Sequence, residues 1–450
     1  MKRVKQPGRS RACNRFAAMS RGLMLVPAAF ACFLHGQSPA EIDSARKAME
    51  AGQYAAAEQA YRKALAGSPS SAVLLMDLGL SLQMQGKSED AMHFYTLALK
   101  QGYVPETYAL LAEEKCRMGE LDILKPMLAR IFKKELRNSR VLSAVAPCYL
   151  DIDQPVESAI VYQQLLESNG YPEDLGLVQL AKSYIRSGQF FAARLSKIPA
   201  GEPFLAALRQ ASDAGDSGAR SAFPQAAKLS QYFSPGLSWS ETVERWRQHP
   251  HDAALLYLAS VLSAEEGMRQ IEICAQRFPG SPYLEQFQAD VLADQGHEDE
   301  AAEAYEELLR QHPDLSDLRY SLGLLREKQQ QWQAASQAFR AQLDAYPSDE
   351  RALAHLSRCL LAMEQYAAVR DLLEPRLHEE RPPQWASLNL AEAEQKLGDP
   401  SAAISILTAA EKRPDADKLV HYRLSHLYAI AGKQADAKRE FALFQAASKQ

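Results

Sequence analysis

Small residues recur at intervals of 34 positions along this sequence, and this period constrains the fold more than any other feature. The grid is unbroken in the C-terminal half and is interrupted once, at Lys125, in the N-terminal half. The residues in phase are Ala57, Ala91, Ala159 and Ala193, and then Ala301, Ala335, Val369, Ala403 and Ala437. A fixed period of this size marks a stack of similar supersecondary units. Such a stack presents an extended surface rather than a catalytic cleft.

Within each period the apolar residues indicate a helix, a turn and a second helix. In residues 316–349, Leu318, Leu322 and Leu325 recur at helical spacing, and a run of three glutamines marks the turn. A second amphipathic segment ends at Pro347, because proline has no amide hydrogen and disfavours helix in the residue before it. The same pattern occupies 38–71, which ends at Pro69, and 282–315, which ends at Pro313.

This pattern resembles the tetratricopeptide repeat (TPR) family, in which Leu-Gly marks the first helix and Ala, followed four residues later by an aromatic, marks the second. Leu-Gly occurs as Leu78-Gly79 and Leu322-Gly323. The second-helix pairs are Ala57/Tyr61, Ala91/Tyr95, Ala301/Tyr305, Ala335/Phe339 and Ala437/Phe441. The expected turn glycines are Gly52, Gly86, Gly188, Gly296, Gly398 and Gly432. The resemblance implies an all-α fold, an α-solenoid of roughly nine or ten TPR-like helix-turn-helix repeats.

Two glycines fall inside predicted helices, Gly79 and Gly323. Glycine there is less favourable than alanine by about 0.5–1 kcal/mol, a cost that is tolerated where a side chain would block close helix approach. We therefore expect tight contacts at both positions, with the aromatic residues of the second helices filling the space between successive repeats.

The repeat register predicts two arms joined by an irregular helical junction. The predicted parts are an N-terminal TPR-like array at 38–198, the junction at 199–250, a degenerate repeat of two short helices at 251–281, and a C-terminal TPR array at 282–450. Prolines and small residues break the register in the junction. Helix is still expected there, because Ser238 and Glu241 have the spacing of a capping box.

The first 36 residues have the composition of an export signal. They contain seven Lys or Arg and no acid, and the apolar run at 22–34 is too short to cross a bilayer comfortably. Cleavage after Ala31 or Gly36 would give an exported protein, periplasmic or extracellular. An uncleaved N-terminal membrane anchor and lipidation at Cys32 are the alternatives.

The net charge argues against a nucleic-acid-binding protein, and the cysteine spacing argues against a cysteine metal site. Without the leader, 44 of the 51 basic residues remain against 56 acidic ones, a formal charge of −12. An acidic body argues against a nucleic-acid partner, which requires a basic stripe. The remaining cysteines have no metal-binding spacing and are expected to be small buried residues. They are Cys116, Cys148, Cys274 and Cys359.

No pattern of catalytic residues stands out. The segment Gly215-Asp216-Ser217-Gly218 is similar to the nucleophile segment of chymotrypsin-like proteases, but the chain lacks the strand pattern of that scaffold. His297-Glu298 and His378-Glu379 lack the second histidine of a zinc helix. We therefore predict that the protein is not an enzyme and has no cofactor and no metal site.

Tetratricopeptide arrays generally bind partners through a concave face lined by the first helix of each repeat, and the resemblance extends that expectation to this chain. Exposed positions on the predicted first helices are candidate contacts, although an aromatic residue there can instead fill the gap between neighbouring first helices. The candidates are Lys182, Arg186, Asp290, Tyr320, Glu327, Arg358, Trp385, Tyr422 and His426.

These observations predict a non-catalytic scaffold that binds a protein or peptide in its groove. With the export signal, the resemblance is to exported bacterial repeat proteins that assist assembly of an envelope or secretion complex. The alternative is recognition of a glycan or other polymer along the groove, as in polysaccharide export. The sequence does not fix the partner or the oligomeric state.

Overall fold

The computed structural model describes residues 39–118, 120–168, 170–206, 237–313, 315, 317–347, 349–378, 382–412 and 418–447. Every regular element in these ranges is a helix, and none of them contains a strand, so the predicted all-α fold is confirmed. The predicted leader, the segment at 215–218 and much of the predicted junction lie outside the described residues. No helix of the described part is both long enough and apolar enough to span a membrane.

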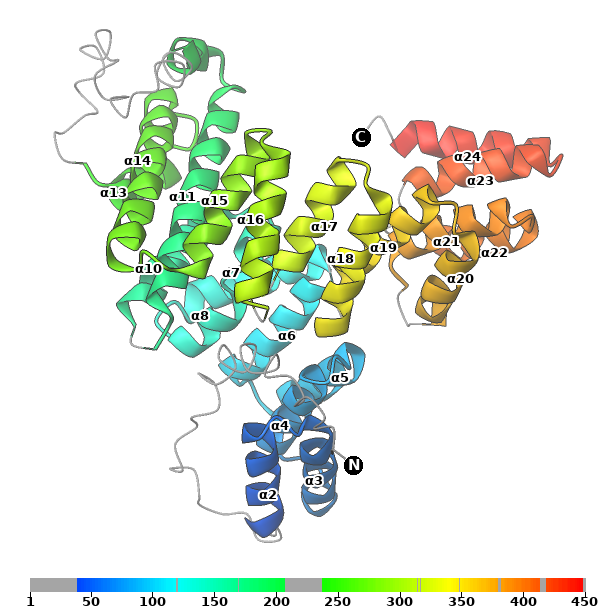
Figure 1. Cartoon of the computed structure of the whole chain (residues 1–450), viewed down its shortest axis with the longest axis horizontal. Helices are drawn as coiled ribbons and strands as arrows, with labels where there is room; N and C mark the ends of the chain where they lie inside the picture. The colour runs from blue at the N-terminus through cyan, green and yellow to red at the C-terminus, as the bar shows by residue number, and fades with distance from the viewer. Residues whose placement is uncertain are drawn as a thin grey trace, which may run out of the picture. The chain divides into compact units, whose positions relative to one another are not determined.

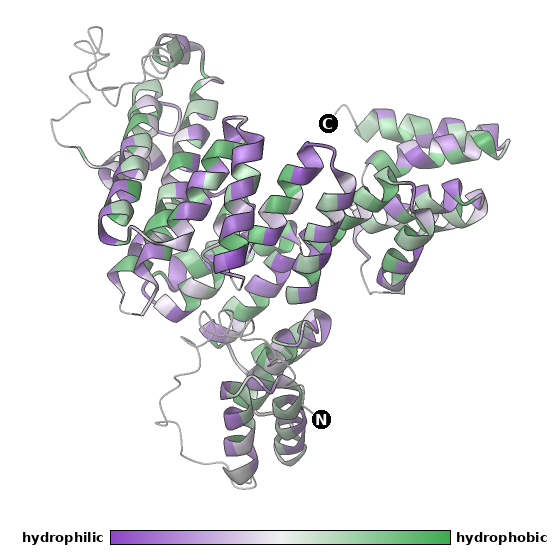
Figure 2. Ribbon diagram, viewed as in Figure 1, coloured by the Kyte–Doolittle hydropathy of each residue, from purple (hydrophilic) through white to green (hydrophobic). Residues whose placement is uncertain are grey.

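The helices, labelled in Figure 1, belong to two compact units. Unit 1 contains Met1–Val291 with His312–Asp314, and unit 2 contains Leu292–Gln311 with Leu315–Gln450. Both are built from antiparallel helix pairs. In Figure 2 each helix carries apolar residues on part of its surface and polar residues on the rest, which is the pattern that stacking of amphipathic helices requires.

Unit 1 begins with repeats that follow the predicted register. Its helices are α2 (Pro39–Glu50), α3 (Tyr54–Gly67), α4 (Ala72–Gln83), α5 (Ser88–Gln101), α6 (Pro105–Arg117), α7 (Leu121–Lys134), α8 (Ser139–Val145), α9 (Cys148–Asp151), α10 (Pro155–Glu167), α11 (Glu173–Leu195), the 3-10 turn η3 (Pro199–Gly201), α13 (Trp239–Gln248), α14 (Ala253–Arg277) and most of α15 (Pro282–Asp294), whose last residues belong to unit 2. Ala91 and Tyr95 of α5 are fully buried. A methyl group at Gly79 would come within 2.6 Å of the Tyr95 ring, which confirms the expected close approach.

Two predictions in unit 1 are wrong, because α11 and α14 are long, continuous helices packed side by side. Gly188 was expected in a turn but lies inside α11, where a Cβ would be 3.2 Å from the carbonyl oxygen of Ser260. The Ser260 hydroxyl donates to the carbonyl of Gly188 at 3.0 Å. Residues 251–281 were expected to form two short helices, yet α14 runs unbroken from Ala253 to Arg277. Glycine here serves close packing between helices, not reversal of the chain.

The described end of the predicted junction packs into the core of unit 1. The capping box at Ser238 and Glu241 is present and begins α13. The indole nitrogen of Trp239 donates to Ser263 of α14 at 2.8 Å, and the Trp239 ring meets that of Tyr184 edge-on. Helices before and after the junction therefore share one core. The predicted division into domains at this point stays a prediction.

A disulfide links Cys116, the penultimate residue of α6, to Cys148, the first residue of α9. Their Cα atoms lie 5.9 Å apart although 32 positions separate them in sequence. The expectation that these two are simply buried small residues is wrong, because stacking of helices brings them together. Cys274 and Cys359 are free and buried, as predicted.

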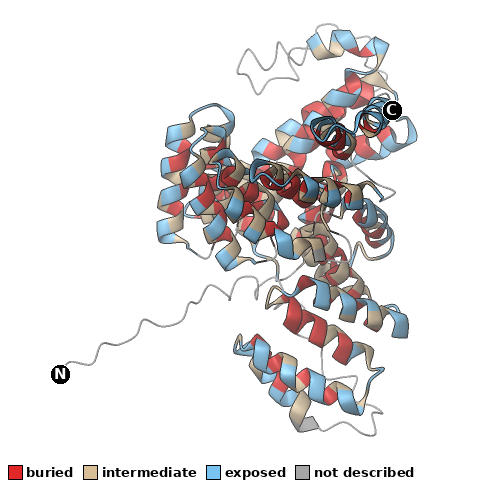
Figure 3. Ribbon diagram, turned by 90° about the vertical axis from the view of Figure 1, so that its right-hand side faces the viewer, coloured by how far each residue is buried: buried red, intermediate tan, exposed pale blue. Residues whose placement is uncertain are grey.

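Unit 2 continues the repeat pattern. Its helices are α16 (Glu298–Gln311), α17 (Leu318–Lys328), α18 (Trp332–Ala345), α19 (Glu350–Ala362), α20 (Tyr366–Leu373), the 3-10 turn η5 (Glu374–His378), α21 (Gln384–Lys396), α22 (Pro400–Glu411), α23 (Lys418–Ile430) and α24 (Gln434–Ala447). Ala335, Phe339 and Ala403 are fully buried, and buried residues line the contacting sides of the helices (Figure 3). Phe441 is the exception to the register. Its side chain is 44% exposed, because no further described helix covers α24.

Candidate functional site

The first helices of the repeats in unit 2 form a connected surface. They are α17, α19, α21 and α23, and each contacts the next. A polar side-chain contact joins every neighbouring pair, so the surface is held together by more than the apolar core beneath it. The residues that make these contacts define what a partner would meet.

Between α17 and α19 the contact centres on Glu327. Its carboxylate lies 2.5 Å from Nδ1 of His355 and 3.1 Å from the guanidinium of Arg358. Glu327 was expected to be exposed, but it is only 8% exposed, because the α19 side chains cover it. Removing a partner from a buried ion pair is destabilising, because it leaves a buried charge without compensation, so these contacts constrain how α17 and α19 pack. Arg358 extends beyond this pair, with 59% of its side chain exposed, and remains accessible to a ligand.

Tyr320, another candidate residue, lies at the same contact between α17 and α19. The Arg351 guanidinium stacks 4.6 Å from the centre of its ring, and the rings of Phe339 and His355 flank it. Arg351 also pairs with Asp317 at 2.8 Å. Tyr320 therefore fills the gap between repeats, the alternative that the sequence left open for aromatic residues.

The ion pair with Arg351 affects the pKa of the Asp349 carboxyl group. Burial alone would raise the pKa of Asp349, but the Arg351 guanidinium and a hydrogen bond from Gln342 outweigh it and hold the pKa below its ordinary value. Asp349 also caps α19, accepting hydrogen bonds from the amides of Arg351 and Ala352. A salt-bridged cap of this kind fixes the start of α19.

Two further contacts complete the series. The amide of Asn389 on α21 donates to Ser357 of α19 at 2.8 Å, and Arg423 of α23 donates to Glu392 of α21 at 2.6 Å. Sequence reasoning missed both pairs, along with His355. The sequence feature that could have indicated these contacts is the separation of the partners. It is 32 positions for Ser357–Asn389, 31 for Glu392–Arg423 and 28 for Glu327–His355. Each is close to the period of the repeat, as expected for neighbours on adjacent first helices.

The remaining candidates of unit 2 differ in exposure. Trp385 is half-buried against the apolar core, whereas Tyr422 and His426 are exposed and meet edge to face with ring centres 4.9 Å apart. His426 borders a surface hollow of about 390 Å³ between α23 and α24. Arg358, Tyr422 and His426 are thus the candidates that a ligand of this surface reaches directly.

In unit 1 the structure joins two candidates that the sequence had placed in separate arms. Lys182 of α11 pairs with Asp290 of α15 at 2.7 Å, and the ammonium lies 5.9 Å from the centre of the Phe287 ring. These side chains are half-buried and fix α15 to α11. Arg186, one turn further along α11, is exposed.

A group of acids lies on the first helices of the N-terminal repeats. Burial raises the pKa of Glu113 on α6 to about 7, although Arg117 pairs with it at 3.0 Å. Burial likewise raises the pKa of Glu114, which is completely buried, and raises that of Asp77 on α4 to about 6. These helices therefore contain carboxyl groups that carry less charge near neutral pH than ordinary acids.

The described residues also contain a group with the side chains of a metal site, although the sequence predicted none. Glu411, His421 and Glu440 come together from three helices of unit 2.

A stack of helix pairs joined through their first helices defines an α-helical repeat protein of the solenoid class. Sequence models described as "Tetratricopeptide repeat" match residues 48–114 and 288–368. One stretch in unit 1 and one that lies mostly in unit 2 are therefore similar to tetratricopeptide repeats. Such repeats are protein-interaction modules and generally act as non-catalytic scaffolds.

Solved structures with low sequence identity are also similar. Yeast Tom70 is 13% identical, with 89% of this chain and 96% of that chain covered and a TM-score of 0.31. The Cut9–Hcn1 hetero-tetramer of APC/C is 13% identical, with 97% and 96% covered and a TM-score of 0.32. The human IFIT1 dimer with m7Gppp-AAAA is 15% identical, with 84% and 91% covered and a TM-score of 0.26. The sequence matches no curated protein.

Proposed function

We propose that this protein is a non-catalytic, exported scaffold that binds a protein or peptide along the first helices of unit 2 and assists assembly of an envelope or secretion complex. The observation that carries the proposal is the series of polar contacts from Glu327 to Arg423, which joins four first helices into one surface. A surface that is already ordered loses little conformational entropy when a partner binds.

The exposed residues of this surface are suited to recognition of a polypeptide. Arg358 presents a guanidinium whose carboxylate partner is buried behind it, and Tyr422 and His426 present an edge-to-face aromatic pair. Arg and Tyr are among the residue types most often found at binding hot spots. A peptide with an acidic residue and an apolar residue suits this combination.

Two observations support export. The basic and apolar leader at 1–36 has the composition of a signal peptide. The disulfide between Cys116 and Cys148 is of a kind that persists in oxidising compartments and is rare in a reducing cytosol. Cell fractionation, with mass spectrometry of the mature N-terminus, tests this part. Recovery of full-length protein with reduced thiols from the cytosol would contradict it.

Capture of partners from envelope extract tests the binding surface. The immobilised protein should enrich a specific protein, and Arg358→Ala with Tyr422→Ala should lose most of it. Arg340→Ala is the matched control, because Arg340 is exposed on the second helix α18 of the same unit. Equal capture by all variants would overturn the proposed surface. Capture that survives proteolysis of the extract but not glycosidase treatment would instead support the polymer-binding alternative.

A further inference from the structure

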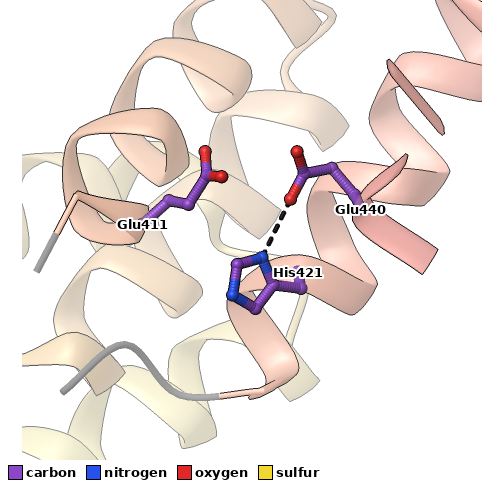
Figure 4. A group of neighbouring side chains, drawn as sticks. All are labelled: Glu411, His421 and Glu440. Atoms are coloured by element: carbon purple, nitrogen blue, oxygen red, sulfur yellow. Dashed lines mark hydrogen bonds and ion pairs between the residues drawn. The ribbon is translucent and has the colours of Figure 1, made fainter. Parts of the chain in front are cut away.

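The last three helices of unit 2 bring together side chains that can bind a metal ion. Glu411 is the final residue of α22, His421 lies on α23 and Glu440 on α24. One ligand atom from each lies within 4.8 Å of the others. Figure 4 draws the carboxylate of Glu411 turned toward that of Glu440, with the imidazole of His421 beside them.

Glu440 is the most constrained of the three. Its side chain is fully buried, and Nδ1 of His421 lies 2.8 Å from Oε2. Arg439 donates to the other oxygen, Oε1, from Nε at 2.9 Å and from a terminal nitrogen at 2.7 Å. One oxygen is thus held by a guanidinium while the second faces His421 and Glu411. Outer hydrogen bonds of this kind orient carboxylate ligands in metal sites.

Glu411 gives a second reason to expect a cation. It is a carboxylate at the C-terminus of a helix, where the helix dipole disfavours negative charge. It also faces a second carboxylate, that of Glu440, in a partly buried place. A divalent cation between these groups would relieve both unfavourable interactions.

We propose that Glu411, His421 and Glu440 bind a divalent transition-metal cation of the zinc type. One imidazole and two carboxylates are a ligand set that zinc accepts, with bonds of about 2.0–2.2 Å and a water molecule in the fourth position. Binding requires the hydrogen-bonded His421 and Glu440 atoms to separate slightly so that the ion can lie between them. Because the ligands come from three helices, the cation ties the last repeat to the helix before it. This inference is independent of the proposed function.

The experiment is a titration of the untagged, EDTA-treated protein with ZnCl₂, followed by calorimetry and by thermal melting. We expect one zinc ion per chain at this site and a rise in the melting temperature. Titration with CoCl₂ gives a spectroscopic readout, because visible absorption of Co²⁺ changes when an imidazole binds. MgCl₂ should produce neither effect, since Mg²⁺ favours an all-oxygen environment.

Three variants connect the signal to these residues. His421→Ala should abolish binding, and Glu411→Gln should weaken it by about tenfold or more while keeping the shape of the side chain. His297→Ala is the control, because His297 is an exposed histidine that contacts a single carboxylate, Glu300, at 3.0 Å. If His421→Ala disturbs the fold, Glu411→Gln decides. No zinc binding, or equal binding by wild type and Glu411→Gln, overturns the proposal.

Discussion

Gly323 lies directly beneath the aromatic ring of Phe339. A methyl group added at Gly323 would come within 2.6 Å of a ring carbon, and the same is true of Gly79 beneath Tyr95. In both repeats the glycine is on the first helix and the aromatic residue is on the second. The aromatic ring therefore packs directly against the backbone of the first helix. The Leu-Gly and Ala-aromatic elements of the repeat are therefore two halves of one contact.

This relationship predicts that Gly323→Ala destabilises unit 2 even though alanine favours helix. The methyl group must displace the fully buried Phe339 ring, and overpacking of this kind costs about 1–3 kcal/mol. Gly102→Ala is the control, because a Cβ there meets nothing within 4 Å. Chemical denaturation measures both variants. If Gly323→Ala is as stable as wild type, the ring does not occupy the position described.

The disulfide predicts a redox-dependent stability of unit 1. Removing a cross-link between residues 32 positions apart should cost about 3–4 kcal/mol in the chain-entropy account. We expect a reducing agent, or Cys148→Ser, to lower the melting temperature of unit 1, with Cys274→Ser as the unpaired control. Non-reducing peptide mapping checks the link directly. Recovery of Cys116 and Cys148 as free thiols after purification without reductant would refute it.

Because Glu327 is buried, we expect its substitution to reduce the stability of unit 2 more than it reduces direct contact with a partner. Glu327→Gln leaves His355 and Arg358 without their carboxylate, which should cost about 1–3 kcal/mol. Glu303→Gln, an exposed position on α16, should cost almost nothing. Thermal melting of the two variants makes the comparison. Equal stability would mean that Glu327 is exposed in solution and belongs to the binding surface.

Local spacing was sufficient to predict most of the fold. The positions of α17 and α18, and the turn between them, follow from the apolar period, because each is fixed by residues within one repeat. Gly188 was misplaced because a turn and a close helix contact both favour glycine, and its partner Ser260 is 72 positions away. The disulfide was missed for the same reason, since stacking of α6 and α9 is not visible in the spacing of Cys116 and Cys148.

The candidate site was less predictable than the fold. A position on the outer side of a first helix is exposed only if the next repeat leaves it uncovered. Glu327 is covered by His355, which lies 28 positions away, whereas Arg358 is not covered. Glu411, His421 and Glu440 have no motif spacing, because each comes from a different helix. Their proximity depends on tertiary packing alone.

The raised pKa values in unit 1 predict that its stability falls as pH rises. Burial raises the pKa of Glu113 from its ordinary 4.5 to about 7. The folded state therefore binds the proton more tightly than the unfolded chain, and this contribution is present below about pH 4.5 and lost as pH approaches 7. Asp77, with a pKa raised to about 6, adds to the same trend. The pKa of Glu58 is lowered to about 2, so its contribution to stability is present at neutral pH and is lost only as pH falls below about 4.5, outside the range of this trend.

Melting temperatures of wild type and Glu113→Gln between pH 5 and 8 test this trend. The glutamine side chain stays uncharged at every pH. The difference in melting temperature between Glu113→Gln and wild type should therefore grow in favour of the variant as pH rises. Glu89→Gln, which replaces an exposed acid on α5, is the control and should follow wild type throughout. Parallel curves for wild type and Glu113→Gln would show that this carboxyl group ionises normally in the folded protein.

Two phenylalanines at the same position of the repeat differ in burial. Phe339 and Phe441 occupy equivalent positions of α18 and α24, yet Phe339 is fully buried and Phe441 is 44% exposed. Phe339→Ala should cost about 3–5 kcal/mol, as for other buried aromatic residues. Phe441→Ala should cost clearly less, because much of its ring already contacts water. Denaturation of the two variants measures the difference. Equal costs would mean that another part of the chain or a second molecule covers Phe441 in solution, and protein-concentration dependence of the Phe441→Ala effect would identify the second molecule.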